Sequence, residues 1–109
     1  MRVLPILSLL AITALAAVPR TQKFTGVITD SMCATADHSQ MRMGPTDAEC
    51  AMACIDAHGA LYGLYDGTGF FTLSDQRAAE KFVAEKVRVI GTLDTKTKTI
   101  QVDSITAEK

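Results

Sequence analysis

Apolar and polar side chains alternate along two segments near the end of the chain, residues 86–93 and 99–103. A period of two is typical of a β-strand with one buried face, so each segment predicts a strand. Residues 24–29, 60–65 and 70–73 are rich in β-branched and aromatic side chains and predict three more. The polar stretches 66–69 and 94–98 are then hairpin turns.

Two further segments carry helix signals. Thr46 begins a T-x-x-E capping box, and Gly59 can take the left-handed conformation that ends a helix, which predicts a helix over residues 47–58. Ser74 is the predicted cap of a second, shorter helix over about 75–83.

The resulting order is strand, helix, strand, strand, helix, strand, strand. Five short strands in a small domain favour a closed ring, because closure removes exposed strand edges. We therefore predict a mostly β fold with one or two short helices, a five-stranded OB-like barrel, with an open α+β sheet as the alternative. The helix at 75–83 takes the usual OB position between the third and fourth strands, and the helix at 47–58 is an insertion. The predicted core contains Val27, Leu64, Phe71, Val87, Val89 and Val102.

Residues 1–17 have the order of a secretory signal peptide: the cation Arg2, an apolar run, and the small residues Ala14-Leu15-Ala16-Ala17. The run is shorter than the ~20 residues that span a bilayer. We expect cleavage after Ala16 or Ala17, a secreted or periplasmic product, a single domain over 18–109, and no stable membrane anchor after cleavage.

Charge narrows the possible partners. The chain has 11 Lys plus Arg and 12 Asp plus Glu, so without Arg2 the balance is ten against twelve, near −2. The basic residues are scattered, and no nucleic-acid partner is expected. No catalytic constellation is identified: a Ser-His-Asp order with supporting motifs, a glycine-rich phosphate loop and a redox C-x-x-C are all missing from the sequence. An enzyme is therefore not predicted, and the partner stays unknown.

The residues that could bind a metal or form a disulfide lie between positions 30 and 58. Cys50 and Cys54 are four apart on the predicted helix and share a face. The loop before the helix is long enough to fold Cys33 and His38 over that face. Three sulfurs and one imidazole form a Cys3His set that suits zinc. Thiolate and thioether donors also suit copper as Cu(I), with Met41 or Met43 as a further ligand.

The same residues allow a reading without metal. Exported proteins meet oxidising conditions, so Cys33 is also a candidate for a disulfide with Cys50 or Cys54, which leaves one buried thiol. In this interpretation His38 is exposed to solvent, and Met41 and Met43 pack under the loop. Asp30 caps the end of a strand. This interpretation is favoured slightly over the metal, and it predicts a non-enzymatic structural or interaction module with a disulfide-pinned loop. The alternative is a zinc- or copper-binding module.

The motif Asp30-Ser31-x-Cys33, followed by His38 and by Cys50-x-x-x-Cys54, resembles an uncharacterised family of small secreted bacterial proteins. The later segments 73–76, 86–93 and 99–102 are also similar to that family. The resemblance implies an exported, β-rich, OB-like domain whose three cysteines and one histidine form the motif, and it implies no known activity. Two departures stand out: one extra residue between Cys33 and His38, and Ala84 at a position where glycine is expected.

Overall fold

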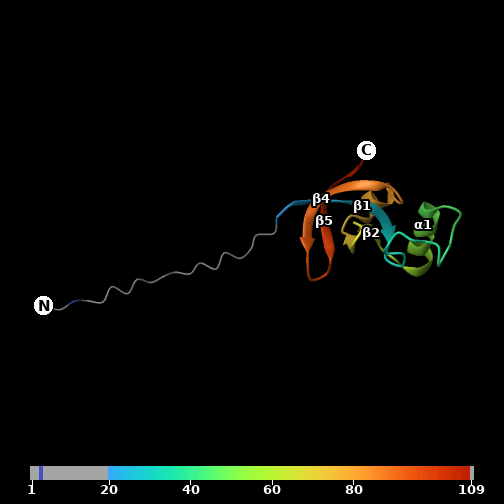
Figure 1. The fold of residues 1–109 in the computed structure, drawn as a ribbon, viewed down its shortest axis with the longest axis horizontal. Helices are drawn as coiled ribbons and strands as arrows, with labels where there is room; N and C mark the ends of the chain where they lie inside the picture. The colour runs from blue at the N-terminus through green and yellow to red at the C-terminus, as the bar shows by residue number, and fades with distance from the viewer. Residues whose placement is uncertain (1–2, 4–19, 109) are drawn as a thin grey trace.

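The computed structural model describes Val3 and residues 20–108 (Figure 1). The predicted signal peptide, residues 1–17, lies outside the described residues apart from Val3. Five strands and two helices follow one another as β1 (Gln22–Asp30), α1 (Asp47–His58), β2 (Tyr62–Tyr65), β3 (Phe70–Leu73), α2 (Gln76–Glu80), β4 (Lys86–Asp94) and β5 (Thr99–Ala107).

Every strand pairs with two neighbours, so the five strands close into a ring in the order β1-β2-β3-β5-β4. The pairs are antiparallel except for the short parallel pair of β3 with β5. The predicted mostly β class is confirmed, and the sheet is a ring rather than the open alternative. The two helices lie where the sequence places them, α2 between β3 and β4 and α1 between β1 and β2.

The inside of the ring is filled by aliphatic side chains. Of the predicted core, Leu64, Val87 and Val89 are fully buried, while Phe71 and Val102 are partly buried and pack against it. Val27 is wrong as a core residue, because the alternation along β1 places its neighbour Ile28 in the core instead. The remaining large, fully buried aliphatic residues are Leu73 and Ile100.

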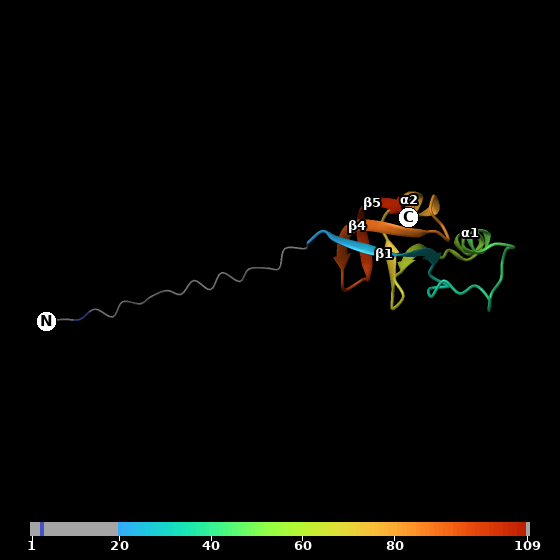
Figure 2. The same ribbon diagram turned by 45° about the horizontal axis from the view of Figure 1, so that its top comes forward.

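Helix α1 has the bounds that the sequence predicts. The Thr46 hydroxyl accepts a hydrogen bond from the backbone N–H of Glu49 at 3.1 Å, and Gly59 ends the helix in the left-handed conformation with φ 67°. The helix lies at one end of the domain, beside the point where β1 ends (Figures 1 and 2). Residues 28–30 of β1 are all buried there.

Helix α2 is shorter than predicted, and its cap is different. Asp75, not Ser74, accepts the capping hydrogen bond, from the N–H of Ala78 at 3.0 Å. The Ser74 hydroxyl instead accepts a hydrogen bond from the N–H of Val102 on β5 at 2.8 Å. The Ser74 hydroxyl, which the local sequence predicts to cap the helix, therefore bonds a strand that is distant in sequence.

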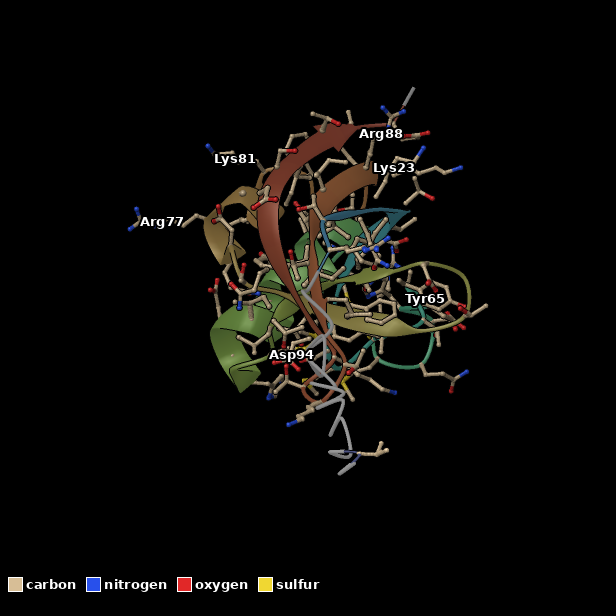
Figure 3. All side chains as sticks on the ribbon, turned by 90° about the vertical axis from the view of Figure 1, so that its left-hand side faces the viewer. Lys23, Tyr65, Arg77, Lys81, Arg88 and Asp94 are labelled. Atoms are coloured by element: carbon tan, nitrogen blue, oxygen red, sulfur yellow. The ribbon has the colours of Figure 1, made fainter. Side chains whose placement is uncertain are left out.

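Charged side chains are spread over the surface. Arg77 on α2 and Lys81, just after it, extend on one side, and Lys23 and Arg88 extend from β1 and β4 on another (Figure 3). Among the described residues, no helix is both long and apolar enough to cross a membrane.

Candidate metal centre

Asp30 organises the turn that follows β1. One carboxylate oxygen, Oδ1, accepts hydrogen bonds from the backbone N–H groups of Met32 at 2.9 Å and Cys33 at 3.0 Å. The hydroxyl of Thr29 donates to the carbonyl of Cys33 at 2.8 Å and tightens the same turn. The strand-end cap expected of Asp30 is confirmed, and it fixes the position of Cys33.

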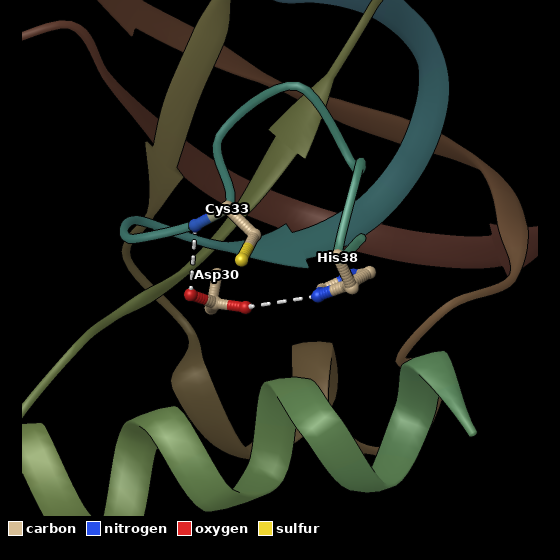
Figure 4. Close-up of side chains that lie close together, drawn as sticks. All are labelled: Asp30, Cys33 and His38. Atoms are coloured by element: carbon tan, nitrogen blue, oxygen red, sulfur yellow. Dashed lines mark hydrogen bonds and ion pairs between the residues drawn. The ribbon is translucent and has the colours of Figure 1, made fainter. Parts of the chain in front are cut away.

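The second carboxylate oxygen of Asp30 is not used by the turn. Oδ2 lies 3.9 Å from Nδ1 of His38, and the two side chains are 0% and 3% exposed. Neither atom has a hydrogen-bond partner among the described residues. A buried polar atom without a partner costs about 1–3 kcal/mol. Two such atoms therefore face each other inside the protein (Figure 4).

Cys33 completes this cluster. Its sulfur, a carboxylate oxygen of Asp30 and a ring nitrogen of His38 all lie within 4.8 Å of one another. A tetrahedral zinc ion, with bonds of about 2.0–2.3 Å, holds its ligand atoms about 3.3–3.8 Å apart. The Asp30–His38 distance of 3.9 Å is about half an ångström wider than the oxygen–nitrogen spacing of such a shell. The three side chains could therefore hold a metal ion after a small closure.

Helix α1 carries two thiols on one face, because Cys50 and Cys54 are four residues apart, and both are fully buried. Burial raises the pKa of Cys54 to about 11, and the neighbouring charge of Asp30 adds to the rise. Burial also raises the pKa of Cys33, and the charge of Asp30 again adds to the rise. Both thiols therefore carry their protons at neutral pH, and a metal would have to displace them.

The two helical cysteines have different surroundings. Cys50 Sγ donates a hydrogen bond to the carbonyl of Met41 and accepts one from the N–H of Met43, both at 3.3 Å. These bonds fasten the loop to α1. The predicted Cys3His set is thus only partly assembled: Cys33 and His38 lie together with Asp30, whereas the Cys50 thiol is engaged by the loop backbone.

The predicted disulfide is absent from the structure. Cys33, Cys50 and Cys54 are all free and buried, so Cys33 is bridged neither to Cys50 nor to Cys54. Each thiol has another neighbour: Cys33 lies with Asp30 and His38, Cys50 bonds the loop backbone, and Cys54 contacts the sulfur of Met43.

The two loop methionines also differ. The sulfur of Met43 lies 3.7 Å from the sulfur of Cys54 and accepts a weak hydrogen bond from its thiol. The side chain of Met41 is 45% exposed, so the predicted packing under the loop is wrong for this residue. Gly44 follows Met43, and a side chain there would meet Glu49 on α1 at 2.9 Å. The loop therefore runs against the start of the helix.

Searches against protein families, curated proteins and solved structures find no match to this chain. The resemblance of the cysteine motif to a family of small secreted bacterial proteins stays a prediction.

Proposed function

We propose that the domain is a non-enzymatic metal-binding module that holds one zinc ion between the end of β1 and helix α1. The observation that carries the proposal is the pair of buried, unpartnered atoms, Asp30 Oδ2 and His38 Nδ1, facing each other at 3.9 Å beside the sulfur of Cys33. A cation bound by all three would satisfy both atoms at once. In its absence neither atom has a hydrogen-bond partner among the described residues, and each is buried.

The donor types favour zinc over harder ions. Carboxylate oxygen, imidazole nitrogen and thiolate sulfur are all zinc ligands. Calcium and magnesium take shells made of oxygen. Cys54 supplies the fourth donor in this proposal, because its thiol is fully buried on α1 and its hydrogen-bond partner is a weak one, the thioether of Met43. Four protein ligands make a closed shell, which is typical of a structural zinc site rather than a catalytic one.

The ion would join three parts of the chain. Asp30 ends β1, Cys33 and His38 belong to the loop of residues 31–46, and Cys54 belongs to α1. That loop has no helix or strand of its own. A metal held in common would add the cross-link that the free thiols do not provide, and its binding energy would count as folding energy.

The test is zinc titration of the reduced, metal-free protein against a competing chelator. We expect one zinc per chain, and we expect His38→Ala to weaken binding at least tenfold. The matched control is His58→Ala, because the chain has 2 histidines and His58 lies exposed at the end of α1. Absence of stoichiometric zinc on the unmodified protein, or equal affinity in His38→Ala, would overturn the proposal.

A further inference from the structure

We infer that the cluster also contains a sulfur-only subsite for a soft monovalent ion, Cu(I), formed by Met43, Cys54 and Cys33. This inference rests on the proposed function, since it shares two thiols with the zinc site. The observation behind it is the 3.7 Å contact between the sulfurs of Cys54 and Met43.

The geometry suits three sulfurs around one ion. With metal–sulfur bonds of about 2.3 Å, three sulfurs in a plane lie about 4 Å apart. The Cys54–Met43 distance is already close to this spacing. Cys33 is buried in the same cluster, with its sulfur within 4.8 Å of ligand atoms of Asp30 and His38. Thiolate and thioether donors select Cu(I), whereas imidazole and carboxylate serve harder ions.

The cluster therefore has two sides. Asp30 and His38 supply the oxygen and nitrogen donors, and Met43 supplies the thioether. In this proposal Cys33, beside Asp30 and His38, and Cys54, beside Met43, belong to both shells. Because they cannot complete both shells at once, zinc and Cu(I) exclude each other. The site then binds zinc when the two thiols join Asp30 and His38, and it binds Cu(I) when they join Met43.

The loop fixes Met43 in this place and leaves Met41 outside it. The backbone N–H of Met43 is held by Cys50 Sγ at 3.3 Å. Arg42, between the two methionines, bonds the carboxylate of Asp47 at 2.6 Å and the carbonyl of Pro45 at 2.9 Å. Met41, with its side chain 45% exposed, is two residues away and has the same chemistry. It is a matched control within one loop.

The experiment is an anaerobic titration of Cu(I), delivered by a colorimetric Cu(I) chelator, and a separate titration of zinc. Three proteins are compared: unmodified, Met43→Leu and Met41→Leu. Met43→Leu should weaken Cu(I) at least tenfold and leave zinc affinity within about twofold, and Met41→Leu should change neither. Cu(I) should release one equivalent of bound zinc. Equal Cu(I) affinity in Met43→Leu, no Cu(I) binding at all, or simultaneous binding of both ions would overturn the inference.

A second measurement covers the case in which Met43→Leu folds poorly. Copper X-ray absorption of the unmodified protein should report a first shell of sulfur alone, and nitrogen or oxygen in that shell would contradict the subsite. His38→Ala separates this inference from the proposed function. It should weaken zinc binding at least tenfold and retain Cu(I). Unchanged zinc affinity would defeat the zinc proposal alone, whereas Cu(I) lost together with zinc would defeat the sulfur-only subsite.

Discussion

Replacing Asp30 by asparagine should separate the two tasks of its carboxylate. The amide oxygen can keep the hydrogen bonds from the N–H groups of Met32 and Cys33. The amide nitrogen takes the place of Oδ2 and can donate to Nδ1 of His38, which is now 3.9 Å away and unpartnered. The substitution therefore preserves the turn, removes a buried anionic ligand, and supplies a partner to the histidine.

These changes have opposite effects with and without metal. Each unpaired buried polar atom costs about 1–3 kcal/mol, so metal-free Asp30→Asn should be more stable than the unmodified protein by about 1 kcal/mol. For a domain of this size that raises Tm by about 4–8 °C. Free zinc at a hundred times its Kd should add about 2.7 kcal/mol to the unmodified protein, or about 10–20 °C. The variant should gain little, so the order of stability reverses on adding zinc.

Four thermal unfolding curves followed by circular dichroism, two proteins with zinc and with chelator, test this reversal. Asp94→Asn is the control, because Asp94 accepts a backbone hydrogen bond from Lys96 at 2.9 Å in an exposed turn between β4 and β5. It should respond to zinc like the unmodified protein. An equal zinc response in Asp30→Asn would show that the carboxylate is not a ligand. A metal-free variant several kcal/mol less stable would show that Oδ2 is not the unpaired atom described above.

Three further outcomes are expected. Cys50→Ser should keep one zinc per chain, and its free energy of unfolding in denaturant should fall by about 1 kcal/mol, because Cys50 bonds the loop backbone. Cys54→Ser should lose the zinc. Loss of zinc in both variants would show that Cys50 is also a ligand. Zinc affinity should rise with pH between 6.5 and 8, about tenfold per pH unit for each thiol proton displaced. The reason is that Cys33 and Cys54, the latter with a pKa of about 11, are protonated throughout this range. Titration calorimetry in several buffers counts the released protons, and an affinity that does not change with pH would exclude thiolate ligands. N-terminal sequencing of exported protein should begin near Ala17 or Val18, and a membrane-bound product that retains Met1 would contradict a cleaved signal peptide.

The fold was predictable wherever the signal is local. The capping box at Thr46 and the glycine at position 59 define α1 at both ends, and alternation defines β4. The cap of α2 was not predictable, because Ser74 and Asp75 are both good capping residues. The choice depends on Val102, which lies 28 residues away and takes the Ser74 hydroxyl.

The site shows the same division. The sequence brings Cys33, His38 and the helical thiols to one region, but Cys50 and Cys54 are equivalent in a helical pattern, and only the path of the loop distinguishes them. In sequence terms the capping role of Asp30 explains this residue fully. A cap needs one oxygen, and nothing in the motif shows where the second one points. Ala84, noted where glycine is expected, has φ 64°, a conformation that glycine adopts at lower cost.

Four aspartates in this domain accept hydrogen bonds from backbone N–H groups in loops and turns, and only Asp30 needs more than the turn to explain it. The other three, Asp37, Asp66 and Asp94, are exposed. Hydrogen bonds from backbone N–H groups lower the pKa of the Asp66 and Asp94 carboxyls, so the stabilising charge of these two is present above pH 3.8 and is lost as pH falls further. Water solvates their remaining oxygens. Asp30 accepts the same kind of backbone hydrogen bonds at the end of β1, but its second oxygen is fully buried opposite His38. A turn does not require that burial, which costs stability unless something binds both atoms. The buried, unpartnered atoms of Asp30 and His38 lie in the same region as the free thiols of Cys33 and Cys54. Unpartnered polar atoms and free thiols together in one region point to a cation.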